Sequence, residues 1–131
     1  MQASDLRKAA LVGSELQEAE LTGVRLVDAE LSRADLMSAQ LADSDLRGTK
    51  LMQADLQRED LAGASLIEAD LSRANLSSAK LTGSSLHKGL LAEADPKKSD
   101  LAGASLVETD LSVVDLTSTD LTKVDLIAPY G

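Results

Sequence analysis

The side chains of this sequence with the most obvious chemical potential are its carboxylates, which recur at a fixed spacing. Of the 22 Asp and Glu residues, 15 stand directly before a leucine or, once, before a proline. One series at twenty-residue intervals contains no basic residue and consists of Glu15, Asp35, Asp55, Asn75, Asp95 and Asp115. A row of carboxylates could mimic a phosphate backbone or hold cations. Two such charges about 4.8 Å apart repel by roughly 1 kcal/mol in water, so the row would need a counterion or a partner.

A structural explanation of the same pattern is favoured. Asp and Asn side chains accept hydrogen bonds from nearby backbone N–H groups, which makes them typical of repeated turns. A functional anionic row is therefore the alternative explanation of these acids, and a turn motif is the favoured one. Lys97 and Lys98 follow Asp95 and add two positive charges beside the row. We treat the row and these two lysines as the candidate interaction surface.

Enzymatic chemistry is not supported by the residues present. His87 is the only histidine and there is no cysteine, which excludes a histidine cluster or a thiolate site for a metal. No base accompanies the many Ser and Thr hydroxyls in a recognisable catalytic arrangement, and no glycine-rich phosphate loop occurs. Open rows of carboxylates also lack the desolvated cleft that separates the pKa values of catalytic acids. The sequence predicts a protein without catalytic residues, cofactor or metal.

The composition limits the partners. The formal net charge of −9 argues against direct binding of nucleic acid, because phosphate neutralisation needs clustered Lys and Arg. No apolar run approaches the length of a membrane span, and the N-terminus lacks a signal-peptide core. We expect a cytoplasmic location if this is the whole chain. The chain has no Trp or Phe and a single Tyr, so an ordinary core of large, varied side chains is excluded.

The elements that position these residues follow from the leucines. Leucine occupies every fifth position from 6 to 126 except position 96, and a small residue stands two positions before most of them. A spacing of five residues matches neither the period of an α-helix nor that of a flat strand. Leucines at this spacing would therefore spread over several faces of either element. The chain must turn once per repeat to bring them to one interior. This pattern predicts a narrow solenoid whose coils hydrogen-bond to one another.

Longer-range similarity indicates how many repeats complete a coil. "LSRADL" at 31–36 returns as "LSRANL" at 71–76, and "LAGASL" at 61–66 returns at 101–106. Glycines 23, 63, 83 and 103 share one phase of a twenty-residue cycle. A coil of four pentapeptides with four faces is consistent with these similarities, although a forty-residue recurrence alone would allow other divisors.

Stretches such as "ADLMSAQLADSDL" and "ANLSSAKLTGSSL" resemble the pentapeptide-repeat proteins, whose motif is A(D/N)LXX. The resemblance covers essentially the whole chain, with repeats from about 4 to 128, and identifies residues 1–131 as one domain. It implies an all-β solenoid, a right-handed quadrilateral parallel β-helix of about six coils, or roughly 29 Å at the inter-strand spacing. The chain departs from many relatives in having no central phenylalanine.

The four faces differ in charge. We name them by their central residues: the first face begins at Leu6, the second at Leu11, the third at Leu16 and the fourth at Leu21, and each continues every twenty residues. The third and fourth faces together hold −7 of the formal charge, with Glu59 counted on the fourth. Glu59 is the one charged residue at the small position two before the leucine. The fourth face is also rich in Gly, Ala and Thr, which gives a flat surface, and its glycines are expected to serve turns with positive φ.

Residues around 89–98 form the one irregular stretch. The leucine count stays in phase through "GLLAEADPKK", so Pro96 takes an inward position of the third face. Proline lacks a backbone donor, and we expect one inter-coil hydrogen bond to be lost, with a small cavity and a local bulge. A tolerated defect is the favoured reading, and a specific contact is the alternative.

Three functions remain open. The leading one is a non-enzymatic interaction or scaffold module with flat acidic faces. The resemblance adds a second, a DNA-mimic inhibitor or protector of DNA gyrase, although the ending "DLIAPYG" lacks the aromatic-rich dimerisation module of those relatives. The third is a purely structural repeat segment without a ligand. We also expect weak end-to-end dimerisation through the N-terminal coil, because an open coil exposes unpaired backbone groups, with Pro129–Gly131 as a small cap at the other end.

Overall fold

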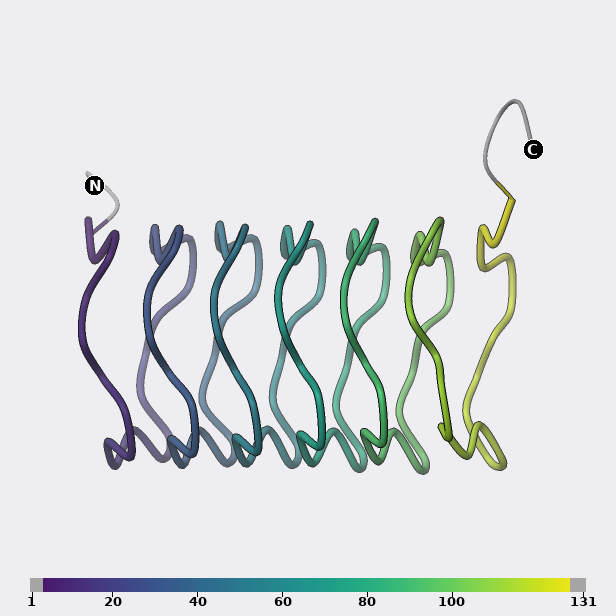
Figure 1. Ribbon diagram of the computed structural model, residues 1–131, viewed down its shortest axis with the longest axis horizontal. Helices are drawn as coiled ribbons and strands as arrows, with labels where there is room; N and C mark the ends of the chain where they lie inside the picture. The colour runs from purple at the N-terminus through teal and green to yellow at the C-terminus, as the bar shows by residue number, and fades with distance from the viewer. Residues whose placement is uncertain (1–3, 128–131) are drawn as a thin grey trace.

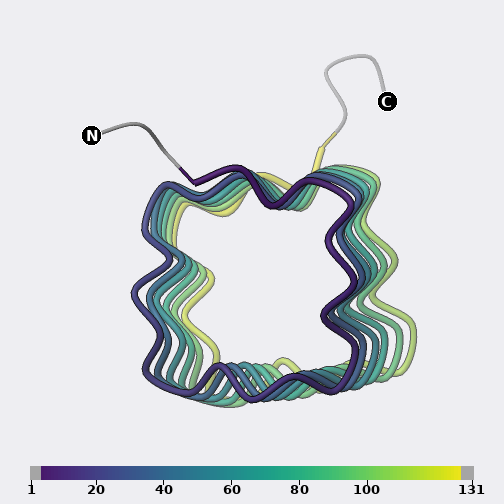
Figure 2. The same ribbon diagram turned by 90° about the vertical axis from the view of Figure 1, so that its left-hand side faces the viewer.

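The computed structural model describes residues 4–127, which wind into a rod of stacked coils. The coils follow one another in chain order along the long axis, from the N-terminal coil at one end to the C-terminal coil at the other (Figure 1). Seen along the axis, the coils superimpose into a square with four sides (Figure 2). The predicted solenoid with four faces is therefore confirmed. The predicted cap at Pro129–Gly131 lies outside the described residues.

No helix and no continuous strand occurs in residues 4–127, because each pentapeptide contributes a single bridging residue. Each bridge is parallel and joins two residues twenty apart, from Asp5 with Arg25 to Ser105 with Asp125. Four pentapeptides therefore complete one coil. We call the residue directly before each leucine the bridge position, and the residue two before it the small position.

Apart from the Pro96 region, the backbone of each pentapeptide in the inner coils makes the same four hydrogen bonds. The second unit of the second coil illustrates them: Leu31 N–H donates to Lys50 O at 2.7 Å and Arg33 N–H to Met52 O at 2.9 Å, both in the next coil. Glu30 N–H donates to Ala9 O of the previous coil, and Ala34 N–H closes the turn on Leu31 O. Since these bonds repeat along the rod, four of the five backbone N–H groups of a regular pentapeptide are paired with backbone oxygens without a conventional strand.

Each turn places the second residue after the leucine in the left-handed region. This residue has a φ between 55° and 69° in 24 units, of which only six have glycine. The fourth-face glycines 23, 63, 83 and 103 are among those six, so their expected role in turns with positive φ is confirmed. A left-handed turn residue of this kind is what turns the chain through the corner of the square.

The interior contains almost only leucine and small residues. Twelve leucines from Leu26 to Leu81 are at most 1% exposed, and the alanines at the small position are similarly buried. Pro96 is buried as well, as predicted for an inward position. Within the described residues, no helix could cross a membrane.

Pro96 disturbs the ladder more than the sequence predicts. The regular pattern requires Lys98 N–H to bond Thr117 O and Asp115 N–H to bond Ala94 O, and both bonds are missing in addition to the one that proline itself cannot donate. The expectation of a single lost hydrogen bond is therefore wrong: three inter-coil bonds are absent on the third face. The backbone bonds of Leu90 and Leu91 are regular, so the irregularity begins at Pro96 and not at residue 89.

Candidate interaction face

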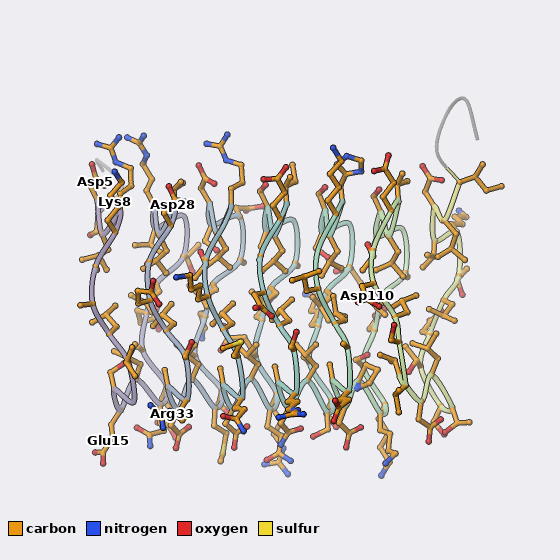
Figure 3. The ribbon with its side chains drawn as sticks, in the orientation of Figure 1. Asp5, Lys8, Glu15, Asp28, Arg33 and Asp110 are labelled. Atoms are coloured by element: carbon orange, nitrogen blue, oxygen red, sulfur yellow. The ribbon has the colours of Figure 1, made fainter. Side chains whose placement is uncertain are left out.

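The third face presents the carboxylate row that the sequence predicts. Parallel bridges join Glu15 to Asp35, Asp35 to Asp55, Asp55 to Asn75 and Asn75 to Asp95. The bridge from Asp95 to Asp115 is absent, because Pro96 removes the hydrogen bonds that would hold it. The continuous row therefore runs from Glu15 to Asp95, and Asp115 lies beyond the break. Figure 3 shows the Glu15 side chain extending away from the rod at its N-terminal end.

The Asp and Asn side chains of this row are held by the backbone. Oδ1 of each side chain accepts a hydrogen bond from the backbone N–H two residues later, with N···O distances of 3.0–3.1 Å. The acceptor–donor pairs are Asp35–Met37, Asp55–Gln57, Asn75–Ser77, Asp95–Lys97 and Asp115–Thr117. The same bond occurs at the bridge-position aspartates of the other faces, for example Asp70 with Ser72. No bond of this kind is made by Glu15. The structural reading of the Asp/Asn preference is thus confirmed.

One carboxylate oxygen of each aspartate remains for other contacts. Asp35 Oδ2 accepts a hydrogen bond from Gln17 Nε2 at 2.6 Å. Asp95 Oδ2 lies 3.7 Å from Lys97 Nζ, which gives a half-exposed pair of small energetic value. The backbone and side-chain hydrogen bonds of Thr117, with a smaller effect of Lys97, lower the pKa of Asp115. These local donors offset part of the repulsion between the carboxylates of the row.

The third face differs from the other three in having no basic residue at its bridge position. At the bridge position the first face contains Arg25, the second Lys50 and the fourth Lys80, whereas the third contains no base. Lys50 lies 2.7 Å from Glu30, and Lys80 lies 3.7 Å from Asp60, so these bases neutralise acids of their own faces. Lys97 and Lys98 are exposed at the corner after Pro96, and only Lys97 is paired with Asp95.

The fourth face is less acidic at its surface than the sequence count suggests. Glu59 has no exposed surface, because the small position on which it lies points into the rod. The formal charge that it adds to this face is therefore not presented to a partner. The sequence marked Glu59 as an exception to the repeat, but its position alone did not show that both carboxylate oxygens are without a partner.

Neither a metal-ligating cluster nor the larger hollow of the described surface coincides with the third-face row. No group of three His, Cys, Asp or Glu residues among the described residues is arranged to hold a metal ion. A shallow hollow of about 280 Å³ lies at the corner after the second face, lined by Met52, Gln53, Ser72, Arg73, Ala92 and Glu93. It does not include any member of the third-face row.

Comparisons with known proteins agree with this architecture. A family model described as pentapeptide repeats matches the chain in eight copies, over residues 1–36, 14–53, 50–87, 60–95 and 97–127. No curated protein sequence matches.

Several solved structures are similar. HetL, described as a pentapeptide repeat protein involved in heterocyst differentiation regulation from the cyanobacterium Nostoc, is 26% identical over 94% of this chain and 72% of its own, with a TM-score of 0.53. A pentapeptide repeat protein from the Arabidopsis thaliana thylakoid lumen is 29% identical over 81% of this chain and 70% of its own, with a TM-score of 0.63. The fluoroquinolone resistance protein QnrB1 is 19% identical over 96% of this chain and 78% of its own, with a TM-score of 0.40.

Proposed function

Because the chain belongs to the pentapeptide-repeat family, we propose that it is a non-enzymatic interaction module whose third face binds a basic surface of a partner protein. The observation that carries the proposal is the row Glu15, Asp35, Asp55, Asn75 and Asp95, which is the one bridge-position row without a base. A solenoid holds such side chains in fixed register, which lowers the ordering entropy that a partner must overcome. We further propose that the solenoid is right-handed with about six coils, as its family resemblance implies.

The row is suited to this role because its aspartates are oriented before binding. Oδ1 of Asp35, Asp55 and Asp95 is engaged with the backbone, so the side chain has little freedom left. A partner with Lys or Arg side chains at a matching spacing would gain charge complementarity along a straight line.

The test is a capture experiment with a matched control. Asp35→Asn combined with Asp55→Asn removes two charges from the third face but keeps the backbone hydrogen bond, as Asn75 does naturally. Asp100→Asn combined with Asp120→Asn makes the same change on the fourth face. We expect partners captured from an extract of the source cell to be lost with the third-face variant and retained with the fourth-face variant. Equal capture by both variants would contradict the proposal, and capture of nothing by the original chain would favour a purely structural segment.

The gyrase alternative has a separate readout. A DNA mimic would change supercoiling by purified DNA gyrase when added at micromolar concentration, and the third-face variant would lose that effect. An unchanged assay would remove this alternative and leave the interaction module in place.

We propose, in addition, weak end-to-end association of the 131-residue chain through its N-terminal coil. Its leucines are only partly buried, and a hollow of about 80 Å³ is lined by Leu6, Leu11, Leu16, Leu21, Leu26, Leu31 and Leu36. Sedimentation of this chain at increasing concentration tests the proposal, and a strict monomer at the highest concentration would contradict it.

A further inference from the structure

Glu59 is an acid enclosed in the leucine interior of the rod. It occupies the small position of the fourth face, where the preceding and following coils have Ala39 and Ala79. All three residues are at most 1% exposed. One carboxyl group therefore lies between the methyl groups of Ala39 and Ala79 in this inward column.

Neither oxygen of this carboxyl group has a hydrogen-bond partner. Oε1 and Oε2 are both buried and unpaired, and the other unpaired buried oxygens among the described residues belong to the neutral hydroxyls of Ser14, Ser84 and Ser99. Burying an unpaired carboxylate costs far more than burying a neutral acid, because the charge loses its hydration without compensation.

Two backbone hydrogen bonds at this position are longer than the matching bonds in other coils. Asp60 N–H lies 3.3 Å from Ala39 O, whereas the matching bonds one coil earlier and two coils later, Gln40 to Ala19 and Asp100 to Ala79, measure 2.9 Å. The turn bond from Glu59 N–H to Leu56 O measures 3.2 Å, against 3.0 Å from Ala79 to Leu76. Among the inter-coil bonds of the fourth face, the one beside the enclosed acid is therefore the longest.

The charged residues around Glu59 do not neutralise it. Arg58 and Asp60 are its neighbours in the chain, Asp43 comes from the previous coil, and Lys80 from the next coil pairs with Asp60 at 3.7 Å. Every other small or central position from Ser4 to Leu126 is non-ionisable. Burial raises the pKa of Glu59 from 4.5 to about 8, Asp60 adds to the rise, and the peptide groups of Leu41 and Ala39 oppose it only in part.

We propose that Glu59 is a pH-sensitive switch, packed as a neutral acid up to about neutral pH and opening the fourth-face ladder between Ala39 and Asp60 when it ionises. The proposal is independent of any partner of the third face. Its direction follows from proton linkage: the folded protein binds the proton more tightly than the unfolded chain, so stability is complete below about pH 4.5 and is lost as the pH rises through about 8.

The first experiment is urea unfolding of the full chain from pH 4 to pH 9.5. Relative to Glu59→Gln, which cannot ionise, the unfolding equilibrium constant of the original chain should rise about tenfold per pH unit between about pH 4.5 and 8. Glu68→Gln removes an exposed acid and should keep the slope of the original chain. Parallel profiles for the original chain and Glu59→Gln would overturn the proposal. If Glu59→Gln does not fold, Glu59→Ala, which matches Ala39 and Ala79, serves in its place.

The second experiment tests whether the opening is local. Amide hydrogen exchange of Asp60, corrected for intrinsic base catalysis, should accelerate between pH 7 and 9, while Asp100 on the same face should not follow. The acceleration should vanish in Glu59→Gln. Equal acceleration at Asp60 and Asp100 would show global loosening and would contradict a local switch.

Discussion

Glu59 and Pro96 are the two inward positions at which the chain departs most from its repeat, and they disturb the rod in different ways. Around Glu59 every backbone hydrogen bond of the repeat is retained, although two are lengthened to 3.2 and 3.3 Å, and the interior receives an unpaired acid. Around Pro96 the interior stays apolar, while three inter-coil bonds are absent. The comparison separates two requirements of this fold, an uncharged interior and a complete ladder.

The fold tolerates both departures, at Glu59 and at Pro96, for the same reason. Each coil contacts only its neighbours, so a defect weakens one interface and leaves the others intact. The bridges on either side of both defects on the remaining faces are regular, for example from Asp100 to Asp120 beyond Pro96. The energetic size and the pH dependence of the two defects should nevertheless differ.

The largest effect is expected for Glu59→Ala. At pH 7 the substitution should raise the free energy of unfolding by about 3 kcal/mol, because each pH unit above 4.5 costs the buried acid about 1.4 kcal/mol. Alanine leaves no strained void, since it occupies this column in the adjacent coils. Urea unfolding at pH 7 and pH 4 measures the difference, and the gain should be smaller at pH 4. A loss of stability at pH 7 would show that the carboxyl group has a stabilising partner.

A smaller, pH-independent gain is expected for Pro96→Leu. Leucine restores the missing donor and fills the column between Leu76 and Leu116, which should add about 2 kcal/mol. Pro96→Ala restores the donor without the side chain and so divides the gain between ladder and packing. Thermal and urea unfolding measure both variants. A decrease in stability for Pro96→Leu would mean that the break is not a defect.

A third and weaker departure, backbone strain at Val113, lies in the coil that follows Pro96. Val113 is 86% exposed and has a φ of 59°, a conformation that β-branched residues rarely adopt. Val113→Gly should stabilise the protein by about 1 kcal/mol because glycine has no Cβ to clash there. Val12, also exposed at the corner after the second face but without positive φ, provides the control: Val12→Gly should not stabilise. Equal effects of the two substitutions on urea unfolding would argue against strain.

An effect of similar size but opposite sign concerns the regular part of the third face. Asp55→Ala should lower the free energy of unfolding by about 1 kcal/mol, because the Gln57 N–H loses its acceptor. Asp55→Asn should be nearly neutral, and so should Glu15→Ala, since Glu15 caps no backbone group among the described residues. Identical losses for Asp55→Ala and Glu15→Ala would contradict the capping role.

The sequence was most informative about the architecture. A five-residue leucine period cannot face one interior on a helix or a strand, so the solenoid and its inward columns follow from the period alone. The twenty-residue coil follows from glycines and repeated stretches, and the bridges between residues twenty apart agree with it. The Asp/Asn preference before leucine was also explained correctly by local backbone hydrogen bonding.

The candidate row was less predictable. The sequence placed Glu15 to Asp115 in one ladder, but the ladder ends at Asp95, because the loss of one donor at Pro96 also separates Lys98 and Asp115 from their partners. A sequence count treats hydrogen bonds as independent, whereas adjacent bonds of a ladder are lost together. The role of the row as an interaction surface stays a prediction.

The sequence by itself determined which residues face inward, because the covalent spacing of small residues and leucines repeats in phase from 6 to 126. Only the tertiary structure decided the state of Glu59. Whether an inward acid finds a partner depends on the coils above and below it. Here both present alanine, so the desolvation of the acid is compensated only in part and its pKa is raised. Periodicity determines where a side chain points, and the packing around it determines whether a buried acid has a partner.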